Sequence, residues 1–357
     1  MQLLLIDANN IGYASMYIPA LSSLSHEGQA TGGILGVIQS TMRLIQKFPG
    51  SVPLLLWDGH ASWRKDILPE YKANRKDPVQ QEVAQSWERQ RAIASILFLH
   101  LGLPQIRAAD AEADDLAGFL TRALDRSGQS TVHRIALASG DTDWWQAIST
   151  KVTWLSPITD KLVTLDSLCS DQVKDGPFLN PDEYLEAKII AGDSSDNIPG
   201  VPGVGLKTAC KLLRQHGGTQ GIIAAVEQGR AKDKRSISIA EHAERIAVNR
   251  RIMDWRHAPT IAPGSWGILR SSFCIEDFRT EAQEWGLQRL LDRFGSGDAW
   301  QSWEQSIPWG DALDFVESTF AEPEPSQPTP LQAAPSQDHP EKSVADLDDS
   351  FWESCFA

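Results

Sequence analysis

The sequence predicts an α/β protein in which a parallel sheet is covered by helices and followed by a smaller helical domain. Between residues 3 and 164, short apolar runs alternate with longer segments of helical periodicity, which is typical of a parallel sheet. From about residue 181 onward the pattern is helical only. The length of 357 residues, with 41% hydrophobic and 22% charged residues, permits two domains with a buried core and excludes a fully disordered chain.

Short apolar runs, closed by polar or turn residues, are predicted to form the strands. The central strands are expected over residues 3–6, 52–57, 105–107 and 133–138, and two later strands over residues 152–155 and 162–164. Apolar residues at helical spacing predict the connecting helices over residues 32–48, 80–101 and 114–124, and another helix after residue 143. In the second domain, helices are expected over residues 182–191, 207–215 and 239–255.

The net charge of −14 is unevenly distributed along the chain. Residues 311–357 contain eleven acids and one base, so they carry −10 and residues 1–310 carry only −4. Removing the nine acids of the site described below would leave this body at +5, so a nucleic-acid partner is not excluded. Residues 321–340 contain six prolines, which predicts a disordered acidic tail over 321–357.

The four cysteines lie far apart, which gives no sign of a disulfide framework or a structural zinc site. No apolar run approaches the ~18 residues of a membrane span, and the first residues do not resemble a signal peptide. We therefore expect a cytoplasmic protein with no membrane partner.

Acidic residues recur where predicted strands end or helices begin. These positions share one edge of a parallel sheet, where α/β proteins bind ligands. Two more acids stand three residues apart in a helical turn, so they face the same side. The nine acids are Asp7, Asp58, Glu112, Asp114, Asp115, Asp141, Asp143, Asp193 and Asp196.

Nine carboxylates in one crevice could not all stay ionised without cations. Oxygen ligands without a competing His or Cys set favour Mg²⁺, with Mn²⁺ as a substitute. Two such ions can activate a water and stabilise the leaving oxygen of a phosphodiester. Taken one at a time, each acid can instead be a turn residue or a helix cap.

Two further segments suit phosphate binding. Residues 63–76 are rich in bases, and Lys72, Arg75 and Lys76 share a face if the segment is helical, beside Arg64 and a Tyr71 that offers a stacking surface. A solvated charged loop is the alternative.

The second segment contains closely spaced glycines, which let backbone N–H groups approach a DNA phosphate. A plain interhelical turn is the alternative. Its residues are Gly200, Gly203, Gly205, Lys207 and Lys211.

Six motifs occur in the order found in the structure-specific 5′-nuclease family, and the chain resembles this family, which includes flap endonucleases and the 5′→3′ exonuclease domain of DNA polymerase I. They are Ile-Asp-Ala-Asn (6–9), Trp-Asp-Gly (57–59), Leu-Pro-Glu-Tyr-Lys-Ala-Asn-Arg (68–75), Glu-Ala-Asp-Asp (112–115), Ser-Gly-Asp-Thr-Asp (139–143) and Gly-Asp-Ser-Ser-Asp-Asn-Ile-Pro-Gly-Val-Pro-Gly-Val-Gly (192–205).

The resemblance implies four regions. A PIN-like catalytic domain is expected over residues 1–180, with a helical arch at about 60–80. A DNA-binding domain with a helix–hairpin–helix turn is expected over 181–295, a helical extension over 296–320, and the tail beyond. The resemblance also implies a potassium ion at the turn over residues 200–205.

Motif position assigns the site residues by resemblance. Asp58, Glu112, Asp114, Asp141 and Asp143 would surround one metal ion, Asp193 and Asp196 would serve a second, and Asp7 and Asp115 would support them. Lys72 and Arg75 would contact the scissile phosphate. One departure is Ala14, which stands where the family commonly has an arginine.

The implied function is Mg²⁺-dependent 5′→3′ exonuclease or flap endonuclease activity on DNA in replication, including RNA primer or flap removal, and we expect a stand-alone, phage-type monomer. The substrates would be 5′ flaps, nicked or branched duplexes and RNA–DNA hybrids. A PIN-type ribonuclease and a non-catalytic DNA-binding replication accessory are the alternatives. The tail, with Phe351, Trp352 and Phe356 among acids, is a candidate docking motif for a replication protein, or else a solubilising end.

Overall fold

A seven-stranded sheet of order β8-β7-β6-β1-β4-β5-β9 carries the fold in the computed structural model, which describes residues 1–76, 78–126, 131–262, 264–294 and 297–321. The five inner strands are mutually parallel, and the two edge strands are antiparallel to their neighbours. The strands are β1 (Gln2–Asp7), β4 (Ser51–Trp57), β5 (Gln105–Ala108), β6 (Arg134–Ala138), β7 (Val152–Leu155), β8 (Leu162–Val163) and β9 (Trp266–Leu269).

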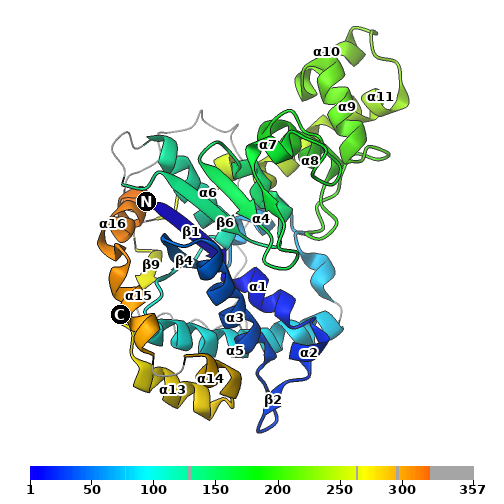
Figure 1. Cartoon of the computed structure of the whole chain (residues 1–357). Helices are drawn as coiled ribbons and strands as arrows, with labels where there is room; N and C mark the ends of the chain where they lie inside the picture. Colours follow the sequence, from blue (N-terminus) through cyan, green and yellow to red (C-terminus); the bar gives the residue numbers. More distant parts are fainter. Residues whose placement is uncertain (77, 127–130, 263, 295–296, 322–357) are drawn as a thin grey trace.

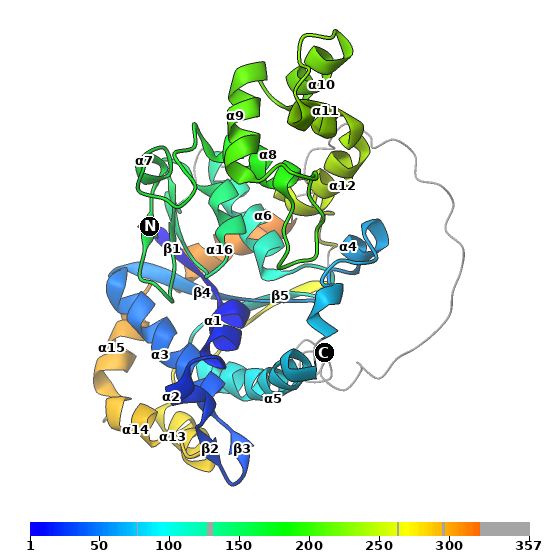
Figure 2. The same cartoon turned by 90° about the vertical axis from the view of Figure 1, so that its right-hand side faces the viewer.

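The central strand β1 is apolar along its length because helices cover both faces of the sheet. Leu5 lies opposite Leu54 of β4 and Leu137 of β6, and all three side chains are buried. Figure 2 shows α6 (Ala113–Arg126) and α16 (Trp309–Ala321) above the sheet, with α3 (Gly32–Lys47) and α5 (Pro78–His100) below it.

The predicted strands and sheet-covering helices are confirmed, with ends shifted by a few residues. The turn expected after the first strand is wrong, because α1 (Ala8–Ser15) begins at once, with Asp7 as its N-cap. The helix expected after residue 143 is a 3-10 helix, η2 (Thr142–Ala147).

The single helix expected over residues 239–255 is two helices, α11 (Lys234–Glu241) and α12 (Ala243–Met253). His242 separates them because its φ of −107° and ψ of 25° leave the helical region.

Helices α8 to α12 form an arm that projects from the body of the molecule, at the upper right of Figure 1. The arm comprises α8 (Pro181–Ala191), α9 (Leu206–His216), α10 (Thr219–Glu227), α11 and α12. The predicted helical architecture of the second domain is therefore confirmed.

In the region predicted to be an arch, α4 (Ser62–Ile67) and η1 (Ala73–Lys76) precede α5.

The helical domain expected to continue to residue 295 is interrupted, because β9 returns to the main sheet and pairs with β5. The helices that follow pack on the body, with α13 against α5 and α16 against α6. They are α13 (Ile275–Glu284), α14 (Gln288–Phe294), α15 (Asp298–Ser306) and α16. The small elements are α2 (Pro19–Ser22), β2 (Ser25–His26), β3 (Gln29–Ala30), α7 (Leu165–Leu168) and η3 (Trp255–His257).

Residue 321, where the predicted tail begins, is still part of α16. Residues 322–357, with the candidate docking motif, lie outside the described residues. No helix within the described ranges has the length and apolar character that crossing a membrane requires.

Candidate active site

A cavity of about 630 Å³ opens where the parallel strands end, between the sheet edge, the arch region and α5. Six of the nine predicted acids line it, together with Lys72 and Arg75 from the arch. The six acids are Asp7, Asp58, Glu112, Asp114, Asp141 and Asp196. The topology therefore gathers carboxylates that are up to 189 positions apart in the sequence.

Asp7 and Asp58 are held at the ends of β1 and β4 by short polar contacts. Asp7 accepts hydrogen bonds from the Asn10 backbone N–H (3.0 Å) and the Ser139 hydroxyl (2.7 Å). Asp58 accepts from the Asn9 side-chain amide (2.6 Å) and from the Ala113 backbone N–H (2.8 Å) at the start of α6. Both carboxylates are thus fixed in place by adjacent elements.

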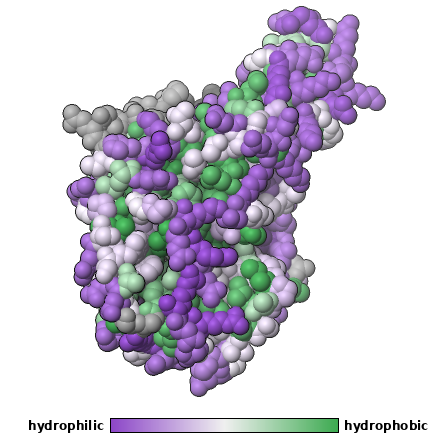
Figure 3. Space-filling model, in the orientation of Figure 1, coloured by the Kyte–Doolittle hydropathy of each residue, from purple (hydrophilic) through white to green (hydrophobic). Residues whose placement is uncertain are grey.

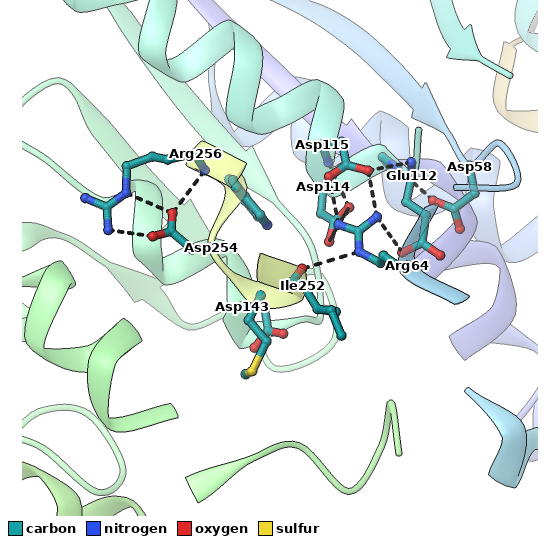
Figure 4. Close-up of polar contacts among 12 residues, drawn as sticks. Asp58, Arg64, Glu112, Asp114, Asp115, Asp143, Ile252, Asp254 and Arg256 are labelled. Atoms are coloured by element: carbon teal, nitrogen blue, oxygen red, sulfur yellow. Dashed lines mark hydrogen bonds and ion pairs between the residues drawn. The ribbon is translucent and has the colours of Figure 1, made fainter. Parts of the chain in front are cut away.

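Arg64 of α4 binds the acids at the start of α6, as Figure 4 shows. Its guanidinium donates two hydrogen bonds of 2.7 Å to Asp115 and lies 3.4 Å from Asp114 and 3.6 Å from Glu112. The Arg64 side chain is only 2% exposed, so it is not on a surface that could contact DNA. The sequence assignment of Arg64 to DNA binding is corrected to an internal counter-ion.

Asp143 and Asp193 meet at Lys188, a residue of α8 that sequence reasoning missed. Lys188 Nζ contacts the Asp143 carboxylate and lies 2.8 Å from an Asp193 oxygen. Figure 4 shows Asp143 apart from the acids around Arg64. Asp143, Asp193 and Asp115 are not among the residues that line the cavity, whereas the other six predicted acids are.

The pKa values of the acids depend on burial, which raises them, and on nearby bases, which lower them. Burial, followed by repulsion from Asp58, raises the pKa of Asp7 to about 8. Burial also raises the pKa of Asp141 to about 6, although Lys188 opposes the shift. For Glu112, burial is outweighed by Lys72 and Arg64, which lower its pKa to about 2. Burial also raises the pKa of Asp114 well above its usual value, although Arg64 opposes the shift. The ionised forms of Asp7, Asp114 and Asp141 are therefore the ones that most need a further positive charge.

The arch region is tied to the segment that carries Asp193 and Asp196. The Lys72 backbone N–H donates to the Asp196 carbonyl (2.9 Å), and the Asn197 side-chain amide donates to the Glu70 carbonyl (2.7 Å). Lys72 Nζ lies 2.8 Å from Glu112, and an Arg75 nitrogen lies 2.8 Å from Asp196. The two predicted phosphate-binding bases therefore reach the cavity through contacts with its acids.

Tyr71 does not provide the stacking surface that the sequence predicted. Its side chain is 4% exposed, and its hydroxyl lies 3.0 Å from Glu112 and 3.2 Å from Asp196. Lys72 and Arg64 also lie over its ring. Lys76 ends η1, where only its backbone is described.

The glycines between α8 and α9 have different roles. A Cβ on Gly200 would lie 1.9 Å from the Ala191 carbonyl oxygen, so this glycine allows the turn to pack on α8. Gly203 has a φ of +75° and Gly205 caps α9, and both face open space. Lys207 and Lys211 are exposed on α9, with Lys207 3.5 Å from Asp175. Gly203, Gly205, Lys207 and Lys211 are exposed to solvent, whereas Gly200 is half-buried.

The donor chemistry of the cavity fits hard divalent ions, because its acids supply oxygen ligands. The raised pKa values of Asp7, Asp114 and Asp141 show that these carboxylates lack sufficient positive charge nearby. However, among the residues that the structure describes, no group of three or more His, Cys, Asp or Glu is arranged to hold a metal ion. Arg64, Lys72 and Lys188 instead occupy carboxylate oxygens.

Two family models match successive parts of the chain. The 5′-3′ exonuclease N-terminal resolvase-like domain matches residues 2–174, and the 5′-3′ exonuclease C-terminal SAM fold matches residues 179–261. DNA polymerase I of Bacillus subtilis is 27% identical over 309 residues, covering 86% of this chain and 34% of that protein. The thermostable DNA polymerase I of Thermus filiformis is 27% identical over 295 residues, covering 82% and 33%. The chain thus spans about a third of the length of these relatives.

Solved structures with the same fold include a zinc-bound bacteriophage T5 5′-exonuclease, with a TM-score of 0.60 and 20% identity, over 80% of this chain and 98% of that one. A bacteriophage T5 flap endonuclease in a complex with DNA and metal ions has a TM-score of 0.60 and 19% identity, over 89% and 100% of the two chains. Because the two family models together match more than half of the chain, this protein belongs to the 5′-3′ exonuclease family.

Proposed function

We propose that this protein is a Mg²⁺-dependent 5′-nuclease that hydrolyses DNA phosphodiesters at 5′ ends or strand junctions during replication. The observation that carries the proposal is one cavity that combines six of the nine predicted carboxylates with Lys72 and Arg75. A negatively charged site alone would repel DNA, whereas bases at its rim can hold the phosphate. The DNA-bound and metal-bound T5 structures support the same reading.

The cavity acids Asp58, Glu112, Asp114 and Asp141 are the candidates to hold one ion, and Asp193 and Asp196 a second, with Asp143 beside them. Divalent ions bound there supply Lewis acidity toward the phosphate oxygens and neutralise the acids. Asp7 and Asp115 support the site from behind, through Ser139 and Arg64. The potassium ion implied for the turn over residues 200–205, a monomeric state and a replication partner stay predictions.

Lys72 and Arg75 are proposed to bind and orient the scissile phosphate. Burial disfavours the Lys72 ammonium, but Glu112 and Asp196 outweigh it and raise the pKa of Lys72, which therefore stays charged. Arg75 is 54% exposed, so its guanidinium is accessible from solvent as well as to Asp196. These two cations stabilise the charge that grows on the phosphate oxygens as the bond breaks.

The test is cleavage of 5′-labelled flap, nicked duplex, RNA–DNA hybrid and single-stranded substrates, with Mg²⁺ or with EDTA. We expect Mg²⁺-dependent cleavage at the 5′ end or junction. Asp141→Asn should lower cleavage by about 100-fold or more while DNA binding is kept, because the loss of a transition-state interaction acts on turnover. Cleavage of single-stranded RNA alone would identify a ribonuclease, and DNA binding without cleavage would identify an accessory protein.

A further inference from the structure

Two asparagine side chains join the arch region to the loop that follows α8. The Asn74 side-chain amide donates to the Ser194 carbonyl (2.8 Å) and to the Ser195 carbonyl (3.3 Å). In the opposite direction, the Asn197 side-chain amide donates to the Glu70 carbonyl (2.7 Å). The hydrogen bonds of these two amides, here called the clamp, connect segments that lie 120 residues apart in the sequence.

The loop held by the clamp is itself closed and carries site acids. Asp193 and Ile198 exchange both of their backbone hydrogen bonds, at 2.8 and 2.7 Å. The loop 193–198 contains Asp196, which lines the cavity, as well as Asp193. It follows α8 at the base of the arm, which projects from the body in Figure 1 and has a mainly hydrophilic visible face in Figure 3. The position of a projecting arm depends on contacts at its base.

The backbone on the arch side of the clamp is strained. Lys72 has a φ of 55°, in the left-handed region. A residue with a Cβ keeps this conformation only where the surrounding structure fixes it. The Lys72 backbone N–H donates to the Asp196 carbonyl (2.9 Å), and this bond lies between the contacts of Asn197 and Asn74 in an antiparallel order. The clamp therefore fixes the backbone from which the Lys72 side chain reaches Glu112.

Charged contacts also hold the arch region, but they use oxygens that a divalent ion would need. Lys72 pairs with Glu112, and Arg75 with Asp196, each at 2.8 Å. Both acids are candidate ligands, and an oxygen that binds an ion is no longer available to a lysine or an arginine. The clamp uses only neutral amides and backbone carbonyls, which are not among the candidate ligands. Ion binding would thus weaken the ion pairs and leave the clamp intact.

We propose that Asn74 and Asn197 are positioning residues, which keep Lys72 and Arg75 beside the cavity when a divalent ion takes over the acidic partners of these bases. The inference rests on the proposed nuclease function and deepens it, because it identifies the side chains that align the phosphate-binding bases with the loop 193–198. Without the clamp, the arch region could move once its ion pairs are lost, and a small displacement of a phosphate-binding base lowers turnover strongly.

The experiment measures hydrogen exchange of the segment 68–75 by mass spectrometry, in EDTA and with Mn²⁺, because amide exchange reports local opening. The tested variant is Asn74→Ala/Asn197→Gly, measured together with its two single variants. Glycine suits position 197, where φ is +56°, so this change removes the amide without adding backbone strain.

The matched control is Asn180→Ala. It also removes one asparagine side chain and its hydrogen bond, because Asn180 caps α8 by accepting from the Glu183 backbone N–H (2.8 Å). Thermal unfolding checks that all variants fold.

For the wild-type protein we expect slow exchange of this segment in both conditions. The clamp variant should stay within about 3-fold of wild type in EDTA, since the ion pairs remain, and should exchange about 10-fold or more faster with Mn²⁺. This direction is distinctive, because a bound ion ordinarily stabilises the fold and slows exchange. The control should have a lower melting temperature but the wild-type exchange of segment 68–75 in both conditions.

Turnover provides a second measurement. With Mg²⁺ and a flap substrate, the clamp variant should lower kcat by about 10-fold or more and change KM by less than about 3-fold, because misplaced bases are lost mainly to the transition state. The control variant should keep the wild-type kcat.

A clamp variant whose exchange does not rise on adding Mn²⁺ would overturn the inference. An equal rise in EDTA and in Mn²⁺ would also overturn it, because the two amides would then only stabilise the fold. Neither result bears on the proposed function, which cleavage by the wild-type protein tests separately. A wild-type protein that cleaves none of the substrates would overturn the proposed function, whereas the exchange measurement would still decide whether the clamp holds the arch region.

Discussion

At the scale of single residues, Arg64 shows how buried acids are kept in place before any ion binds. It is a buried cation shared by Asp115, Asp114 and Glu112, and Trp63 lies against its guanidinium at 4.4 Å. Removing it leaves three acids at the start of α6 without a counter-ion. Breaking one side of a buried ion pair costs more than the pair contributes, because an unpaired charge stays buried.

We therefore expect Arg64→Met to lower the free energy of unfolding by about 3 to 5 kcal/mol, whereas the exposed neighbouring substitution Lys65→Met should change it by less than about 0.5 kcal/mol. Urea unfolding followed by circular dichroism measures both. The double variant Arg64→Met/Asp115→Leu should recover part of the loss. Equal stabilities of the two single variants would show that Arg64 does not act as the internal counter-ion.

Lys188 gives a second prediction at this scale. Its ammonium lies between Asp143 and Asp193, and it is the main reason that the pKa of Asp193 is lowered despite the burial that raises it. A cation at this position competes with a divalent ion for the same oxygens. Lys188→Met should therefore lower the melting temperature in EDTA and increase the stabilisation gained from Mn²⁺, as measured by thermal unfolding with and without the ion.

The matched control is Lys174→Met, which replaces an exposed lysine. A Lys188→Met variant with the same response to Mn²⁺ as the control would show that Lys188 does not compete with a divalent ion for these carboxylates. Lys188 was not predicted from the sequence because it lies outside the six motifs. The signal was present, since a group of buried acids requires internal bases and Lys188 stands five residues before Asp193.

At the scale of elements, strands and sheet-covering helices could be predicted because each is a continuous apolar run or a strongly periodic segment. Contacts that depend on tertiary structure could not. Nothing local in the Tyr71 segment indicates that the ring is buried under Lys72, because that burial results from the arch folding back on residues 193–198. The return of β9 to β5 is equally non-local, since its partner lies more than 150 residues earlier.

The turn between α8 and α9 allows a test of which glycine is structural. Gly200→Ala would place a Cβ 1.9 Å from a backbone oxygen of α8, and overpacking of this kind costs about 1 to 3 kcal/mol. Gly203→Ala meets no atom but adopts a positive φ, which costs about 1 to 2 kcal/mol, and Gly205→Ala meets neither obstacle.

We therefore expect Gly205→Ala to be close to wild type in thermal unfolding, and Gly200→Ala to destabilise the arm. Limited proteolysis, which reports local opening of the arm, should show the same contrast between the two variants. If Gly205→Ala were the more destabilised of the two, the packing of Gly200 against α8 would not be what fixes this turn.

At the scale of the whole molecule, the described residues after 261, where the second family model ends, pack onto the main sheet domain and form part of its core. Arg270, just after β9, lies 2.7 Å from Glu304 of α15 and stacks on Trp309, which together join the strand to the last two helices. The Trp300 indole N–H donates to the Leu101 carbonyl at the end of α5. The edge of the catalytic sheet is thereby covered by segments that follow the arm in the sequence.

This closure predicts that an isolated fragment ending at residue 261, where the second family model ends, does not fold. Such a fragment lacks β9 and exposes the faces of α5 and α6 that α13 and α16 cover. We expect far lower soluble expression and no cooperative thermal transition, compared with a chain ending at residue 321. A fragment 1–261 that unfolds cooperatively near the temperature of the longer chain would show that the terminal helices are dispensable for the core.

The buried acids of the cavity also make the stability of the whole molecule depend on pH and on divalent-ion binding. In the folded protein the pKa of Asp7 is raised to about 8 and that of Asp141 to about 6, so the native state holds these protons more tightly than the unfolded chain does. Ionising the two acids therefore destabilises the metal-free fold progressively as pH rises from about 4 to about 8.

A divalent ion that binds the ionised acids must displace those protons, so its stabilising effect should grow over the same pH range. We expect the increase in melting temperature on adding Mg²⁺ or Mn²⁺ to be small at pH 5.5 and several-fold larger at pH 8. The Asp141→Asn variant, which removes one of these two titrating acids, should show a smaller increase at pH 8. A metal-induced increase that is independent of pH in the wild-type protein would mean that the ions bind away from these acids.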